Sequence, residues 1–175
     1  DSPWPKFGQN NRNTSRRDED PSLVAHYPFN GNASDAAGGD NNGTVRGADL
    51  SIGQAGDTNG SYLFDGTNDD IAIGDKGFPM GNSPRTISGW VKADASGTGD
   101  QTLLFYGKRE AGKGFWLGID GGGELEASGY GDTAASHDFD ANGTNLKDGN
   151  WHHIAFSTDA NQTARLYVDG LLKAT

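Results

Sequence analysis

The chain has no cysteine, and hydrophobic residues make up only 33% of its 175 residues. Without cysteine no disulfide framework can hold the fold, so a buried core has to, and a chain of this length can form a two-layer core in one domain. No apolar run approaches the roughly 20 residues that a membrane-spanning helix needs. The sequence therefore argues against a disulfide-stapled miniprotein and predicts no membrane insertion.

Positive charge is scarce as well. The chain carries 14 Lys and Arg against 24 Asp and Glu, which gives a net charge of −10. An acidic surface repels phosphate backbones and anionic lipids, so we expect no nucleic-acid partner. The acidity and the absence of cysteine together favour a secreted or cell-surface protein.

Turn-forming residues are abundant instead. The chain has 28 glycines, and Asn-Gly or Asp-Gly dipeptides begin at residues 30, 42, 59, 65, 120, 142, 148 and 169. These dipeptides favour tight turns between antiparallel strands, because their residues tolerate a positive φ. The sequence therefore predicts a fold made of many short, sharply connected segments. A further strand should follow the turn at Asp169, but the chain stops at Thr175, so we expect this strand to be missing.

Between the turns, apolar and polar residues alternate. In the stretch 149–157, Ile154 and Phe156 fall on one side, and in 164–170, Leu166 and Val168 do the same. A period of two is typical of half-buried strands. The other expected strands cover 23–29, 45–52, 62–66, 70–73, 86–92, 102–108, 114–119 and 124–130. Such a pattern predicts an antiparallel sandwich or barrel.

Four segments, in a fixed order, carry a family resemblance. They are Leu23–Asp35 with Asn41–Val45, Tyr62–Gly66, Arg85–Lys92, and Asp148–Ala155 with Leu166–Gly170. Together they resemble the laminin-G-like, concanavalin A-like domains found in many secreted microbial proteins. The resemblance implies an all-β, antiparallel two-sheet jelly-roll sandwich over residues 23–175, preceded by a polar leader or linker at 1–22.

The resemblance is less specific for function, because this fold hosts lectins, adhesion domains, glycosidases and plain spacers. It implies a carbohydrate-binding or adhesion module rather than an enzyme. The family usually closes its sheet with a strand that would lie beyond Thr175, so we expect a C-terminally incomplete domain with an open edge beside 23–29. The second interpretation is a structural subunit or spacer of an extracellular assembly, completed by a strand from a neighbouring molecule.

Asparagine and aspartate crowd the loop at 30–44. Calcium takes about six to eight oxygen ligands from carboxylates, amides and backbone carbonyls, and this loop offers all three types. The resemblance also implies a structural calcium ion near this loop. We predict Asp35, Asn42 and Asn30 as its ligands, with simple turn formation by the same residues as the alternative.

A sugar-binding surface is predicted around Trp116. In 115–119, Phe115, Leu117 and Ile119 should face the core, which leaves Trp116 on the other side beside the small Gly118. A tryptophan on the less apolar face of a strand can stack against a sugar.

We predict that Tyr106, Tyr130 and Asp132 join Trp116 at this surface. The alternative is that these rings cover a second packed layer. Trp90 and Trp151 are expected to be packing residues.

Two further patterns are interpreted as structural. Glu124 and Glu126 lie two residues apart on an expected strand, which resembles the alternating acids of catalytic relatives, but Ser128 stands where a third acid would be. We expect a solvated strand face there, with a polysaccharide hydrolase or lyase as the third interpretation. His152 and His153 should point to opposite faces of a strand, so we expect hydrogen-bonded histidines rather than a zinc site.

Overall fold

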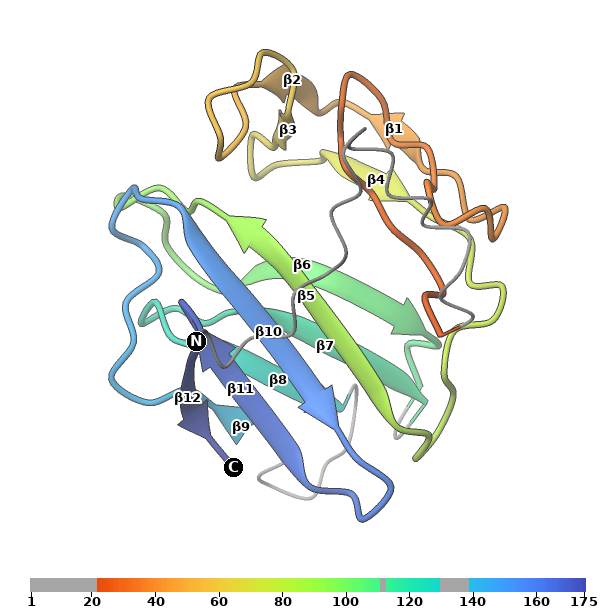
Figure 1. Ribbon diagram of the computed structural model, residues 1–175. Coiled ribbons are helices and arrows are strands. Elements are labelled where there is room, and N and C mark those ends of the chain that lie inside the picture. The colour runs from red at the N-terminus through yellow and green to blue at the C-terminus, as the bar shows by residue number, and fades with distance from the viewer. Residues whose placement is uncertain (1–21, 111–112, 130–138) are drawn as a thin grey trace, which may run out of the picture. The chain divides into compact units, whose positions relative to one another are not determined.

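A computed structural model describes residues 22–110, 113–129 and 139–175 (Figure 1). Every regular element among these residues is a strand, and every strand pair is antiparallel. The all-β fold class is thereby confirmed. The chain forms two compact units that divide between Phe78 and Pro79.

The first unit contains two small sheets. Strands β1 (Thr44–Arg46) and β4 (Asp70–Ala72) form one, and β2 (Asp49–Ser51) and β3 (Ser61–Leu63) form the other. The expected strand 45–52 is therefore divided in two. The division falls at Gly47, whose φ is +80° and whose missing Cβ leaves room for the Asp69 carboxyl.

Asn41 ties the first unit together. Its side chain is fully buried, its Nδ2 donates to the Lys76 carbonyl (3.0 Å), and its Oδ1 accepts from the Lys76 amide (2.9 Å). The Tyr27 hydroxyl donates to the Asn41 carbonyl at 2.6 Å. Burial, with the nearby charge of Asp35 added, raises the pKa of Tyr27 to about 12. Hydrogen bonds of buried polar side chains thus connect the segments of this unit, whereas apolar packing connects those of the second.

The predicted strand at 23–29 is wrong, because no strand forms there. The backbone amide of His26 donates to the Asp35 carboxylate (3.0 Å), and Phe29 has a left-handed φ of 53°. Both features are incompatible with a regular ladder at these positions. The first described strand is therefore β1.

The second unit consists of two four-stranded sheets, coloured from green to blue in Figure 1. One has the order β12-β11-β10-β5, and the other has the order β6-β7-β8-β9. The strands of the first sheet are β5 (Arg85–Val91), β10 (His152–Thr158), β11 (Ala164–Val168) and β12 (Leu171–Ala174). Those of the second are β6 (Gln101–Gly107), β7 (Gly114–Ile119), β8 (Leu125–Gly129) and β9 (Phe139–Asp140).

The core of this unit lies between the two sheets. The rings of Phe115 in β7 and Phe156 in β10 meet with centroids 4.9 Å apart. Around them lie Leu146, from the loop between β9 and β10, and buried residues of both sheets, namely Leu117, Ile119, Leu125, Ile154, Leu166 and Val168. The predicted alternation of Ile154 with Phe156 and of Leu166 with Val168 is confirmed, and so is the inward position of Leu117 and Ile119.

Strand β12 follows the Asp169–Gly170 turn, where the sequence predicts a strand but the chain is expected to stop too soon to supply it. Both turn residues have positive φ, 51° and 76°, as a type I′ hairpin requires. The residues Leu171–Ala174 pair with β11.

Trp90 corrects another expectation. It is 49% exposed rather than packed, because β5 alternates and directs Ile87 and Val91 toward the core.

His152 links the start of β10 to two turns. Its Nδ1 lies 2.8 Å from Asp169 Oδ2, and its Nε2 lies 3.1 Å from Asp148 Oδ1. The bond to Asp169 raises the pKa of His152, burial opposes this, and Asp148 adds to it. Hydrogen bonds from Asn150, and then from His152, hold the pKa of Asp148 at about 2. The predicted hydrogen-bonded histidine is present, and its two ring nitrogens bridge two carboxylates.

The hydrogen bonds of His152 to these two carboxylates predict a pH dependence of the free energy of unfolding. Because pairing raises the native pKa of His152 above its unfolded value near 6.5, its contribution is fully present below about pH 6.5 and is lost as the pH rises through the native pKa. The carboxylates are partly exposed, so we expect a loss of about 1 kcal/mol or less. Urea unfolding at about pH 5.5 and 8.5 should show the decline in the native chain and a smaller one in His152→Gln. His153→Gln is the matched control and should keep the decline; an unchanged decline in His152→Gln would contradict the assignment.

Candidate functional site

Trp116 lies on the outward face of the β6–β9 sheet, as the sequence predicts. Its neighbours Leu117 and Phe115 face the core, and Trp116 itself is half-buried. A Cβ built on Gly118 would come within 2.1 Å of the indole ring, so the ring lies directly over the glycine. The indole Nε1 donates to the Thr102 hydroxyl at 2.8 Å. The ring is therefore fixed across the sheet surface instead of standing away from it.

Polar residues flank the ring in a row across the sheet. Thr102 in β6 pairs with Gly118 in β7, Gly118 pairs with Glu126 in β8, and Glu126 pairs with Asp140 in β9. Directly paired residues of an antiparallel sheet point to the same face. The ring over Gly118 thus has a hydroxyl on one side and two carboxylates on the other.

A second row adds an aromatic residue and a hydroxyl. Phe105 pairs with Trp116, and Trp116 pairs with Ser128. The guanidinium of Arg109 lies over the Phe105 ring, 5.4 Å from its centroid. Sequence reasoning did not select Phe105, Ser128, Arg109 or Asp140. The pairing register that brings them to Trp116 is not visible in any one strand.

Tyr106 does not join this surface, and the prediction of a shared platform is wrong for it. It pairs with Phe115 and so faces the core side of the sheet, where it is 8% exposed. Its hydroxyl accepts a hydrogen bond from Arg85 and donates one to the Pro79 carbonyl. Burial raises the pKa of Tyr106, while the Arg85 charge opposes the rise. Tyr106 is a packing residue of the second unit.

The other two predicted ligand residues, Tyr130 and Asp132, lie outside the described residues. Their part in sugar binding stays a prediction.

Glu124 lies just before β8 and accepts a hydrogen bond from the Gly143 amide at 2.7 Å. The acidic residue that lies opposite Glu126 in the strand register is Asp140 and not Glu124.

The predicted calcium ligands are engaged in the first unit's own loop. Asp35 Oδ1 accepts from the amides of His26 (3.0 Å) and Ala37 (2.9 Å). Burial alone would raise the pKa of Asp35, but these amides, with those of Asn41 and Gly39, outweigh it and lower the pKa. Four amide donors account for the lone pairs of the carboxylate, which leaves none directed at a metal.

Of the two predicted asparagine ligands, Asn42 is engaged through its side-chain oxygen and Asn30 through its backbone carbonyl. Asn42 Oδ1 accepts from the Asp35 amide at 2.9 Å, and the Asn30 carbonyl accepts from Asn32 Nδ2 at 3.4 Å. In this arrangement the loop does not fit a calcium cage. Within the part of the chain that the structure describes, no three His, Asp or Glu side chains are grouped so that they could hold a metal ion. Calcium binding by Asp35, Asn42 and Asn30 stays a prediction.

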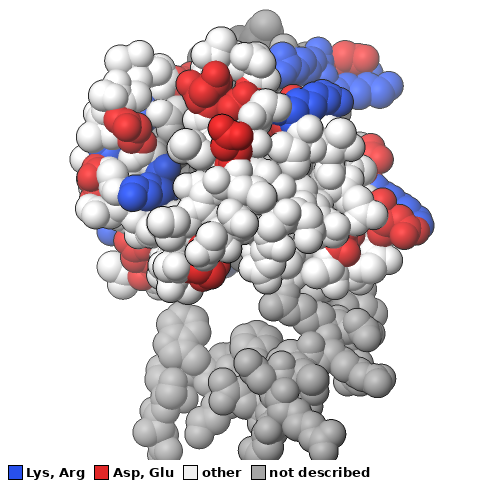
Figure 2. Space-filling view, turned by 90° about the horizontal axis from the view of Figure 1, so that it is seen from above, with Lys and Arg blue, Asp and Glu red and all other residues white. Residues whose placement is uncertain are grey.

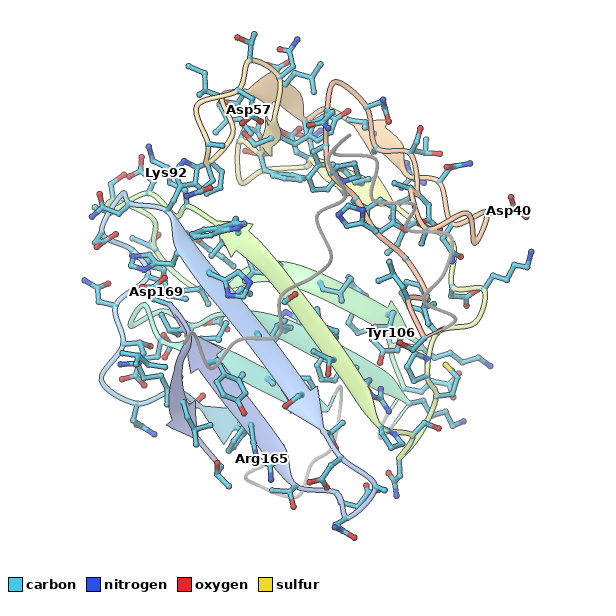
Figure 3. All side chains as sticks on the ribbon, in the orientation of Figure 1. Asp40, Asp57, Lys92, Tyr106, Arg165 and Asp169 are labelled. Carbon is cyan, nitrogen blue, oxygen red and sulfur yellow. The ribbon has the colours of Figure 1, made fainter. Side chains whose placement is uncertain are left out.

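Figure 2 shows one face, on which acidic side chains stand in several small groups among uncharged residues. Two of the residues labelled in Figure 3 form exposed or half-exposed ion pairs: Asp40 with Lys76 at 3.2 Å, and Arg165 with Asp159 at 3.1 Å. The paired acids Glu126 and Asp140 are distinguished from these groups by their position beside an aromatic ring.

Comparison with known proteins assigns the family. A profile described as the concanavalin A-like lectin/glucanases superfamily, of the laminin G type, matches residues 64–175. The match covers more than half of the chain, and the chain therefore belongs to this family. A search of curated proteins found no match. No helix in the described residues could cross a membrane. The description of the family names lectins and glucanases, and membership suggests a module of the carbohydrate-binding or adhesion type.

Removal of the Asp35 carboxylate should destabilise the first unit. In Asp35→Ala four backbone amides lose their acceptor at a buried position, and we expect a loss of about 2–4 kcal/mol in the free energy of unfolding. Chemical denaturation monitored by circular dichroism measures this loss. Asn30→Ala is the control, because its bond to Asn32 uses the unchanged backbone, and it should cost no more than about 0.5 kcal/mol. Equal stability of the two variants would show that the Asp35 bonds are unimportant.

Calcium should have little effect on melting while Asp35 keeps these bonds. We expect the melting temperatures in about 5 mM calcium and in chelator to agree within about 1 °C, because a ligand stabilises only the state that binds it. Differential scanning fluorimetry suffices for the measurement. A rise of several degrees that disappears in Asp35→Asn would show that the loop rearranges into a calcium site.

Proposed function

We propose that the chain is a carbohydrate-binding module of a secreted or cell-surface protein, and that it holds sugar on the outward face of the β6–β9 sheet. One observation carries the proposal: the Trp116 ring lies across Gly118 and is fixed there by Thr102. An aromatic ring held flat on a sheet is the surface that the C–H side of a pyranose stacks against.

The ring is ordered before any ligand arrives. A mobile tryptophan would lose rotamer freedom when a sugar binds, and that loss would weaken the complex. In this chain the Thr102 hydroxyl and the bare backbone of Gly118 already hold the indole in one orientation. The conformational entropy is thus given up during folding, which favours binding.

Polar groups stand where sugar hydroxyls would reach. Thr102 and Glu126 flank the ring in one row, and Ser128 lies beside it in the next. Neighbouring strands are about 4.8 Å apart, so substituents of a pyranose on the ring come within hydrogen-bonding distance of these side chains. Aromatic stacking with a few polar contacts is the usual design of a sugar site.

The family membership supports carbohydrate binding, and the net charge supports an extracellular location. The concanavalin A-like superfamily contains lectins, and a net charge of −10 without cysteine suits an extracellular protein. Adhesion to a glycan-bearing surface is the same binding chemistry on a larger ligand. We propose binding without turnover for two reasons. Laminin G-like domains are typically binding modules, and the carboxylate of Glu124, one of the two candidate catalytic acids, accepts a hydrogen bond from the Gly143 amide.

Trp116→Ala tests the proposal. A glycan array identifies a ligand of the native chain, and titration calorimetry then compares the variant. We expect affinity to fall at least about tenfold, which corresponds to about 1.4 kcal/mol. The fold should remain intact, because the ring packs on an outward face and not in the core.

Trp90→Ala is the matched control. Trp90 is a half-exposed tryptophan on the outward face of the other sheet, where its ring meets His153 edge-on. It should bind the same glycan with unchanged affinity. Equal loss in both variants, or no loss in Trp116→Ala, would contradict the assignment of the site.

A further inference from the structure

The carboxylate of Glu124 is directed at the backbone of the turn that follows β9. In this turn the Thr144 amide donates to the Ala141 carbonyl at 3.2 Å, and Gly143 has a φ of 77°. The Gly143 amide donates to Glu124 Oε1 at 2.7 Å. The residue before Gly143 is Asn142, which is exposed. A carboxylate thus accepts the glycine amide of an Asn-Gly sequence.

Backbone contacts on both sides hold this carboxylate beside the turn. The Leu125 amide donates to the Thr144 hydroxyl at 3.3 Å, and the Leu125 carbonyl accepts from the Ala141 amide at 2.8 Å. The Glu124 amide donates to Asp120 Oδ1 at 2.7 Å, and its carbonyl accepts from the Asp120 amide at 3.0 Å. Glu124 is therefore fixed next to the turn by its own backbone and by that of its neighbour.

An Asn-Gly sequence can lose the asparagine amide group spontaneously, because glycine has no side chain to hinder the reaction. The nitrogen of Gly143 bonds to Asn142 Cγ, the Cγ–Nδ2 bond breaks, and ammonia leaves with the proton of the glycine amide. Water then opens the cyclic imide at either carbonyl, which gives aspartate or isoaspartate without any oxidation or reduction. The reaction requires the glycine nitrogen to give up its proton.

We propose that Asn142 is a deamidation site of this domain and that the Glu124 carboxylate restrains the reaction. The hydrogen bond keeps the proton on the Gly143 nitrogen, and the negative charge of the carboxylate disfavours an anion beside it. Glu124 is thus a positioning residue that acts through Gly143 and takes no part in bond making or breaking.

The chain has three further Asn-Gly sequences, and all four lie in the part of the chain that the structure describes. In those three, backbone carbonyls accept the glycine amide: Phe29 and Asn59 for Gly31, Ala33 for Gly43, and Asp57 for Gly60. A side-chain substitution leaves such a carbonyl in place. Of the four glycine amides, that of Gly143 is the one whose described acceptor is a side chain. Loss of one carboxylate should therefore open this site and not the others.

Deamidation at this position would alter the edge of a sheet. Isoaspartate adds a main-chain atom to the turn that follows β9, and β9 pairs with β8 through Phe139 and Asp140. The same sheet carries Trp116 in β7. The order of the sheet edge thus depends on the amide of Asn142.

The test follows deamidation in the full chain, stored at mildly alkaline pH, by peptide mapping with mass spectrometry. The map resolves all four Asn-Gly sites and separates aspartate from isoaspartate. We expect Asn142 to react at least about tenfold faster in Glu124→Ala than in the native chain, because a charge-assisted hydrogen bond is lost. Glu124→Gln keeps an acceptor without the charge, and its rate should lie between the two.

Two controls separate a local effect from a general one. Glu110→Ala removes an exposed glutamate that pairs with Lys113 at 2.6 Å, and it should leave the rate at Asn142 unchanged. The other three Asn-Gly sites are controls within the same molecule, because a loosened fold would accelerate all four. Equal acceleration at all four sites in Glu124→Ala, or no acceleration at Asn142, overturns the proposal.

Amide hydrogen exchange tests the native chain without any variant. Base-catalysed exchange removes the same proton from the Gly143 nitrogen that deamidation removes. By nuclear magnetic resonance we expect this amide to exchange at least about tenfold more slowly than in the unfolded chain. Exchange at the unfolded rate would show that Glu124 does not hold the amide, and would overturn the proposal. Neither experiment uses a glycan, so both are independent of the carbohydrate-binding function.

Discussion

The contact between Phe115 and Phe156 sets the geometry of the second unit. These two rings join the sheets across the core, and once Phe115 is directed inward, the period of two directs Trp116 outward. A shift of one residue in the register of β7 would exchange the two faces of the strand. The buried Leu117 and Ile119 oppose such a shift, since they would then be exposed to water. The outward site is therefore a consequence of how the core packs.

The part of this site that lies within one strand could be predicted from sequence. Alternation alone places Trp116 beside Gly118 on the outward face. The part that depends on pairing could not. Tyr106 lies in the neighbouring strand, but its register with Phe115 directs it to the core. Asp140 falls in a stretch that looks like a loop, and only its pairing with Glu126 brings it to the site.

The first unit shows a different limit of sequence reasoning. The residues around 23–29 alternate as a strand does, yet a side chain distant in sequence, Asp35, takes the His26 amide. The side-chain oxygens of asparagine and aspartate can accept hydrogen bonds from backbone amides, and the same oxygens can bind a metal ion. Composition does not distinguish the two uses. The laminin-G resemblance correctly identified the fold, since a fold requires only the ordered pattern of strands. It was less informative about the loop, where individual hydrogen bonds decide.

Gly118 touches no proposed ligand, yet the site depends on it, because any side chain there would push the indole off the sheet. Tryptophan and glycine at this spacing thus act as one structural unit. Among relatives, the loss of the ring should remove the reason to keep the glycine, and a larger residue at the glycine position should be accompanied by replacement of the tryptophan. Transfer of this face to another β-sandwich would likewise require both residues together, on the outward side of a strand whose neighbour supplies a hydroxyl.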